Sequence, residues 1–145
     1  MKRVILHDSH SNPWVAMRDV ASPEALAKLS DSEAGAQVRF HDVAGSSPIQ
    51  LFEIHYPADA QIKVHAHDEE EIIWVANGDI RLGNRAFGPG SSVYIAANTL
   101  YSFSAGPEGL HMLNFRPRAD YSMISPEEYT QRRHLPQDKP AAVRQ

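Results

Sequence analysis

KVHAHDEEEIIWVANGD, residues 63–79, places two histidines one residue apart, then four acidic residues, an apolar run and Asn-Gly-Asp. Residues i and i+2 of an extended strand point to the same face, so His65 and His67 are predicted to project together. Glu71 begins the apolar run, and from this second strand it can approach the two imidazoles. Because Asn-Gly tolerates the positive φ angles of tight turns, we expect a hairpin turn at 77–79.

Short apolar or alternating runs continue through residues 37–118, and Gly, Pro, Asn or Asp separates most of them. Regularly spaced short strands with turn signals predict an antiparallel sandwich or barrel. GPEG at 106–109 is expected to close a second hairpin. The sequence therefore predicts an all-β fold for this part of the chain.

Both ends of the chain read differently from this central part. In the extension 1–36, Ser22 and Pro23 are typical of the N-cap and first position of a short helix. In the segment 119–145, Ser125 and Pro126 predict a second capped helix. A length of 145 residues suits a single domain, 1–145, with helical extensions on both sides of the barrel.

Composition excludes several classes of protein. A net charge of −4 disfavours non-specific nucleic-acid binding, which needs a basic surface. No apolar run reaches the ~18 residues of a membrane span, so we expect no membrane partner. His7 and Asp8 interrupt the N-terminus too early for a signal peptide. Cysteine is absent, which excludes disulfides and thiol chemistry and fits a cytoplasmic protein.

The spacing His65-x-His67-x-x-x-Glu71, followed seven residues later by Gly78, resembles the first conserved motif of the cupin superfamily. That motif normally opens with a glycine six residues before the first histidine, and Asp59 occupies this position here. Two imidazoles and one carboxylate on one side of an ion also form the facial arrangement of non-heme iron oxygenases.

The stretch GSSVYIAANTLYSFSA, which begins at Gly90, is similar to the second cupin motif but is degenerate. Ala96 stands where proline is usual, and Asn98 where glycine is usual. Tyr101 replaces the histidine that is normally the fourth ligand, and Ala105 replaces an asparagine. The resemblance spans roughly residues 49 to 116 and is more specific for the fold than for the activity.

The resemblance implies a cupin-type antiparallel jelly-roll β-barrel with one divalent metal bound by His65, His67 and Glu71. Fe(II) is the favoured metal, with Mn, Ni or Zn as alternatives. Tyr101 is then either a ligand, as a phenolate, or a neutral hydrogen-bond donor to the substrate or a metal-bound water. The resemblance also implies a homodimer.

Other residues are predicted to line the same pocket. If GPEG closes a hairpin, residue 101 faces 114 and residue 103 faces 112, so Phe103, Met112 and Asn114 share the face of Tyr101. His55 is a further candidate for the lining, with a hydrogen-bonded histidine of the barrel wall as the alternative.

We expect a metal-dependent enzyme acting on a small oxygenated organic substrate, with dioxygenase-like oxidative cleavage as the leading reaction. Metal-assisted lyase or isomerase chemistry of the cupin type is the alternative reaction for such an enzyme. A second hypothesis is a non-catalytic module that binds a small ligand, because one barrel hosts many activities. A third is an isomerase or epimerase without metal, with His65 or His67 as base and Tyr101 as acid.

Overall fold

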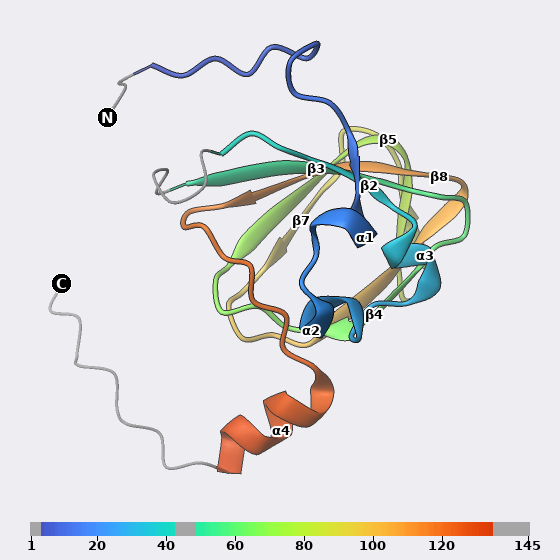
Figure 1. Ribbon diagram of the computed structural model, residues 1–145. Coiled ribbons are helices and arrows are strands. Elements are labelled where there is room, and N and C mark those ends of the chain that lie inside the picture. The colour runs from blue at the N-terminus through green and yellow to red at the C-terminus, as the bar shows by residue number, and fades with distance from the viewer. Residues whose placement is uncertain (1–3, 43–48, 135–145) are drawn as a thin grey trace, which may run out of the picture.

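The computed structural model describes residues 4–42 and 49–134 (Figure 1). In chain order the elements are β1 Val15–Ala16, α1 Met17–Val20, α2 Pro23–Leu26, α3 Asp31–Ala34, β2 Gln37–Phe40, β3 Gln50–Tyr56, β4 Gln61–His65, β5 Glu71–Leu82, β6 Arg85–Phe87, β7 Ser92–Ile95, β8 Tyr101–Arg116 and α4 Pro126–His134. No helix in these ranges is long and apolar enough to span a bilayer.

Strand β8 is the spine of the barrel. It pairs with β4 near its start, with β3 near its end and with β5 along much of its length. Strands β6 and β7 extend from β5, while β1 and β2 extend from β3. Within the described residues all eight strands join one antiparallel sheet, which curls round a cavity (Figure 1). The predicted all-β jelly-roll barrel with helical extensions is confirmed.

Alternation along each strand separates the core from the outer surface. On β5, Ile73 and Val75 are fully buried and point inward, whereas Ile72 and Trp74 are nearly half exposed. Burying branched apolar side chains on one face of a strand supplies most of the free energy that holds such a sheet. The same alternation decides which polar side chains enter the cavity.

The predicted hairpin turn at 77–79 is wrong. Strand β5 continues through these residues to Leu82, and the turn to β6 lies at 83–84. Gly78 instead forms part of an irregular stretch of the β5–β8 ladder, with a φ of +72°. A Cβ at this position would lie 2.1 Å from the carbonyl oxygen of Gly109, so the glycine serves a close approach of two strands.

GPEG does not close a hairpin either, because β8 runs unbroken through 106–109. Tyr101 pairs with His65 and not with Asn114, whose partners are Phe52 and Ile73. The inner residues of β8 change from odd to even numbers across this stretch, so both halves of the strand still face inward. The predicted facing pairs are wrong, although the residues named do share a face.

Both predicted helix starts are confirmed. The Ser22 hydroxyl accepts a hydrogen bond of 3.2 Å from the Ala25 amide, and the Ser125 hydroxyl accepts one from the Glu128 amide. A further short helix, α3, was not predicted. It begins with a capping box, in which Glu33 and Ser30 each accept a hydrogen bond from the other's backbone amide.

Candidate functional site

The two predicted histidines meet inside the barrel. His65 ends β4 and His67 follows it, and both side chains are buried and line the cavity. Their ring centroids are 4.7 Å apart in an edge-to-face arrangement. Ala66, between them, faces away and forms a bridge with Ile124, which fixes the backbone at this point.

Backbone carbonyls hold each imidazole in one tautomer. His65 Nδ1 donates to the Lys63 carbonyl at 2.7 Å, and His67 Nδ1 donates to the Ser122 carbonyl at 2.5 Å. Burial lowers the pKa of His65, and burial followed by the Arg116 charge lowers that of His67 to about 4. Both rings are therefore neutral near pH 7, and each keeps a lone pair on Nε2. Histidines that bind metals are fixed in this way.

Glu71 begins β5 as predicted, but it lies behind the cavity wall. Its Oε2 accepts hydrogen bonds from Asn114 Nδ2 at 2.7 Å and from the Arg116 guanidinium at 3.0 and 3.1 Å. Its Oε1 accepts one from the Tyr101 hydroxyl. Burial alone would raise the pKa of Glu71, but the Arg116 charge and the other neighbours that favour the ionised carboxylate, among them the Tyr101 hydroxyl, together outweigh burial and lower it. The carboxylate is thus ionised and oriented.

Tyr101 lies between Glu71 and His65. Its hydroxyl donates to Glu71 and is 3.1 Å from His65 Nε2. Burial, and next the Glu71 charge, raise the pKa of Tyr101 well above its usual value, so the phenol keeps its proton. Because that single proton is given to Glu71, a neutral His65 faces the phenol oxygen with a lone pair and no hydrogen between them.

The sequence reasoning missed Arg116 and the segment it holds. Arg116 Nη1 donates to the Asp120 carbonyl and to Gln50 Oε1. The Asp120 carboxylate accepts from the Glu69 and Ser122 amides at 2.9 and 2.7 Å. Continued alternation from Met112 and Asn114 would have indicated that Arg116 points inward. Nothing local in the sequence marks Asp120.

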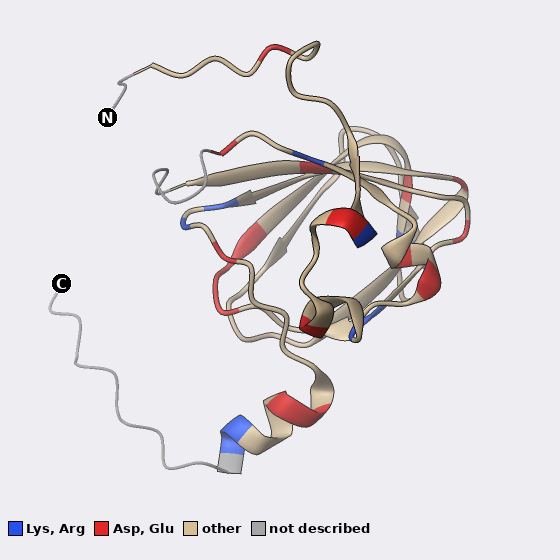
Figure 2. Ribbon diagram, in the orientation of Figure 1, with Lys and Arg blue, Asp and Glu red and all other residues tan. Residues whose placement is uncertain are grey.

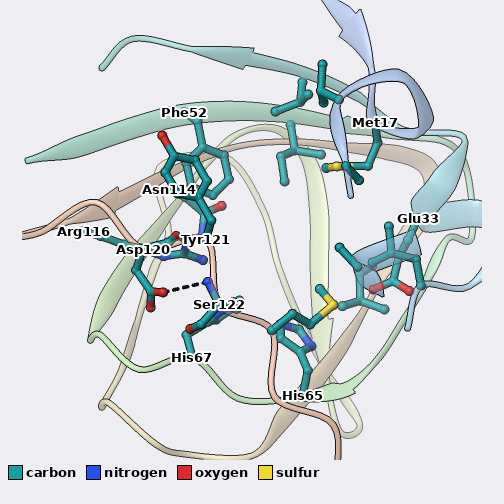
Figure 3. A pocket seen from close by; sticks show the side chains of 18 of the residues that line it. Met17, Glu33, Phe52, His65, His67, Asn114, Arg116, Asp120, Tyr121 and Ser122 are labelled. Carbon is teal, nitrogen blue, oxygen red and sulfur yellow. Dashed lines mark hydrogen bonds between the residues drawn. The ribbon is translucent and has the colours of Figure 1, made fainter. Parts of the chain in front are cut away.

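The cavity has a volume of about 350 Å³, within the usual range for small-molecule sites. Its wall is mainly apolar and includes Val38, Phe40, Phe52, Ile54, Ile62 and Met17. The polar groups gather near His67, Arg116 and Asp120, and Figure 3 shows these three together at one end of the lining. An apolar chamber with a few convergent polar groups is suited to an organic ligand.

The other predicted pocket residues divide into two groups. Phe103, Met112 and Asn114 line the cavity together with Tyr101. His55 does not, because it belongs to the outer face of β3. There it is exposed and stacks on Trp14, with ring centroids 4.7 Å apart.

Segments from both ends of the chain cover the cavity. Met17, Ala25 and Leu29 line it from the N-terminal side, and residues 120–123 line it from the C-terminal side. The ammonium group of Lys28 joins the two sides. It donates to the Met123 carbonyl at 2.7 Å and forms an ion pair with Glu128 at 2.9 Å.

The donor set suits a divalent metal in its chemistry, since it offers two neutral imidazoles and an oriented carboxylate. It is not gathered round one point. Across 4–42 and 49–134, no three His, Cys, Asp or Glu side chains are placed to hold an ion together. The Tyr101 phenol occupies the position between His65 and Glu71. A third ligand would therefore be Glu71 Oε1 or Tyr101 itself.

No protein-family model matches the chain, and neither does any curated protein. Similar solved structures include the polyketide cyclase RemF from Streptomyces resistomycificus, with 19% identity over 92% of this chain and 93% of that one and a TM-score of 0.60. An acetylacetone dioxygenase from Acinetobacter johnsonii shares 13% identity over 90% and 91%, with a TM-score of 0.59.

An RmlC-like cupin protein from Ralstonia eutropha is also similar, with 15% identity over 86% of this chain and 81% of that one and a TM-score of 0.58. These structures share the barrel while their names point to different reactions, and identities this low establish the fold alone. The alternating strands, the His65-x-His67 pair at the cavity and these similarities lead to one conclusion: the chain has the fold of the cupin superfamily.

Proposed function

We propose that this protein is a cupin enzyme that converts a small oxygenated organic molecule by using one divalent metal, with dioxygenase-like oxidative cleavage as the leading reaction. The observation that carries the proposal is the pair of buried imidazoles. Their Nε2 atoms are left with lone pairs because Nδ1 of each is bonded to a carbonyl. The polyketide cyclase and the acetylacetone dioxygenase, which share the fold, add support for an enzyme.

His65 and His67 would hold the metal, and Glu71 is the third ligand that we propose. Fe(II) is favoured, and Mn, Ni or Zn suit the same donors. The metal, when bound, supplies a Lewis acid and a centre where oxygen can react. All other contributions come from side chains that orient these donors or the substrate.

Three groups of contacts would serve the reaction. Asn114 and Arg116 hold the Glu71 carboxylate in one orientation, which lowers the cost of ordering the site. The Tyr101 hydroxyl donates to Glu71, and by turning away from that carboxylate it could donate its proton to an oxygen of the substrate. The covering segments at 17–29 and 120–123 keep water away from a bound molecule.

A second function has a specific observation in its favour. His65 Nε2 keeps a free lone pair 3.1 Å from the oxygen of Tyr101, whose hydroxyl donates to Glu71. A lyase or isomerase without a metal could use His65 as base and Tyr101 as acid from this arrangement. In a binding module without catalysis, the same three side chains would only shape the pocket.

Elemental analysis of untagged protein, after reconstitution with Fe(II) under anaerobic conditions, tests the first proposal. We expect about one metal ion per chain, lost in His67→Ala and kept in His55→Ala. His55 is the matched control because it is a histidine outside the cavity. Protein that never takes up metal contradicts the proposal and favours the metal-free reaction.

Oxygen uptake separates the reaction classes once the metal content is known. We expect consumption of oxygen with at least one compound in a panel of diketones, phenols and keto acids. Metal-loaded protein that changes one of these compounds without oxygen uptake would instead be a lyase or isomerase. No turnover of any of them would favour the binding module.

A further inference from the structure

Glu33 is a buried carboxylate that neither the sequence reasoning nor the proposed reaction uses. It lies on α3, is 3% exposed and lines the cavity. Its Oε2 accepts a hydrogen bond of 2.5 Å from the Ser30 amide, as part of the capping box. Figure 3 shows Glu33 at the end of the lining away from Arg116 and Asp120.

The other two carboxylates near the cavity differ from Glu33 in how their charge is balanced. Glu71 is in an ion pair with Arg116, and Asp120 accepts two backbone amides. Within the described part of the chain, Glu33 has no cationic partner. A buried carboxylate without a cationic partner is costly to ionise, so an ion-pairing ligand would be favoured there.

The net charge of the site points the same way. Glu33, Glu71 and Asp120 bring three carboxylates to the cavity and its wall, whereas Arg116 brings one guanidinium. Acidic residues also gather on the short helices α2 and α3 beside the cavity (Figure 2). Without a metal, these charges would repel an anionic ligand and attract a cationic one. A divalent ion at His65 and His67 would offset the negative charge at that end of the cavity, and Glu33 would remain the carboxylate without a cationic partner.

Aromatic rings stand near this carboxylate. Tyr56 and Phe103 line the cavity, with ring centroids 6.0 Å apart. Burial, and next the Glu33 charge, raise the pKa of Tyr56, which places this phenol within electrostatic reach of Glu33. Aromatic faces beside a carboxylate attract organic cations, because the ring quadrupole and the charge act together.

We propose that the cavity binds a ligand with an apolar body and an ammonium group, and that the ammonium group pairs with Glu33. The inference rests on the proposed function in assuming that this cavity is the substrate site. The oxygenated end of the ligand then extends toward His65 and His67. At that end Asn114 Oδ1 is buried without a hydrogen-bond partner in the described residues, and it can accept a donor from the ligand.

Isothermal titration with three probes of one skeleton tests the charge preference. Phenethylamine carries the ammonium group, phenethyl alcohol is neutral, and hydrocinnamate is anionic. We expect phenethylamine to bind at least about tenfold more tightly than the alcohol, because a paired buried charge recovers its desolvation cost. Hydrocinnamate is expected to bind more weakly than both.

Glu33→Gln is the decisive variant. Glutamine keeps the capping box and the shape of the side chain but removes the charge. We expect it to reduce the preference for the amine to less than about threefold while leaving the affinity for the alcohol unchanged. Asp31→Asn, an exposed change on the same helix, should keep the full preference. Thermal unfolding checks that each variant is folded.

The inference is overturned if the parent protein shows no preference for the amine, if none of the probes binds at millimolar concentration, or if Glu33→Gln keeps the preference. Titrations are run on both metal-free and metal-loaded protein. If the protein takes up no metal but prefers the amine, this inference stands and the proposed metal chemistry is contradicted. If it takes up metal but shows no preference for the amine, the metal chemistry stands and this inference is contradicted.

Discussion

The guanidinium of Arg116 lies 3.0 Å from Glu71 Oε2, and the two side chains are 6% and 1% exposed. Removing both charges from water is expensive, and their attraction repays that cost only while both are present. The pair therefore serves to orient Glu71 more than to stabilise the barrel. Its residues come from β8 and β5, so it also ties two long strands together at the cavity.

Arg116→Met tests this view of the ion pair. The substitution leaves Glu71 buried with a charge and without its cationic partner, so we expect a loss of about 3–5 kcal/mol in the free energy of unfolding. Urea denaturation of metal-free protein measures it. In the double variant Glu71→Gln and Arg116→Met no charge is left unpaired, so part of the loss should be recovered. A double variant less stable than Arg116→Met would contradict the argument.

Tyr101→Phe separates the two roles of the phenol. A neutral Tyr101 that donates to Glu71 only orients this ligand, so its loss should weaken metal affinity by about 10–100-fold and leave saturation at one ion per chain. The ferric form of the parent protein should show no phenolate-to-iron absorption band. Tyr101→Phe should therefore leave the visible spectrum unchanged. Metal titration followed by absorption spectroscopy measures both effects.

Tyr94→Phe is the control for this experiment, because Tyr94 lies on the outer surface and bonds to Glu70. It should bind metal as the parent does. If Tyr101→Phe loses a visible band that Tyr94→Phe keeps, then Tyr101 is a ligand and not a neutral donor.

Period-two alternation made the histidine pair predictable. His65 and His67 share a face because a strand fixes the direction of each side chain, and the structure places both in the cavity. The helix starts at Ser22 and Ser125 were also predictable, because an N-cap is a hydrogen bond between residues close in sequence. The turns predicted at 77–79 and 106–109 were wrong. Close contact between two strands, and not chain reversal, determines the conformation of Gly78.

The rest of the site depends on contacts between distant parts of the chain. Arg116 pairs with Glu71 across the β5–β8 ladder. Because the register of that ladder shifts twice, the pair cannot be inferred from the spacing of the two residues. Glu33 reaches the cavity only because α3 packs against β4, where the Ser30 hydroxyl donates to the Gln61 carbonyl at 2.6 Å. No pattern in the sequence predicts that contact between α3 and β4. From sequence alone, an acidic residue in a short helix is therefore expected to be exposed to solvent.

Glu53 on the outer face gives the structure a pH dependence in acid. Burial alone would raise the pKa of Glu53, but hydrogen bonds from Arg39, His41 and His111 outweigh burial and lower it from 4.5 to about 2. A lowered pKa in the folded state means that the stabilisation is present above about pH 4.5. It is lost as the pH falls toward about 2.

Urea denaturation across this pH range measures the effect. Glu53→Gln should lower the free energy of unfolding at neutral pH by about 1–3 kcal/mol, because hydrogen bonds to a charged group are lost. It should also flatten the decline between pH 4.5 and pH 2. The control Glu108→Gln, at an exposed position, should leave the decline intact. An equally steep decline in Glu53→Gln would assign the acid sensitivity to other carboxylates.

Alanine substitution of two glycines, one within β5 and one just after it, separates the energetic cost of disturbing close packing from the cost of the backbone conformation. Gly78 and Gly83 both have positive φ angles, of 72° and 60°. A Cβ at Gly83 meets nothing within 4 Å, whereas one at Gly78 lies 2.1 Å from the Gly109 carbonyl oxygen. Gly83→Ala should therefore cost only the left-handed conformation, about 1–2 kcal/mol.

Gly78→Ala should cost that amount and at least about 1–3 kcal/mol more, because β5 and β8 must move apart to admit the methyl group. Urea midpoints of the two variants, compared at equal m-values, measure the difference. Since the strands also carry Glu71 and Arg116, separation at Gly78 should further weaken metal binding, while Gly83→Ala should not. Equal costs for the two alanines would mean that the ladder yields at Gly78, and that close approach of β5 and β8 does not require glycine there.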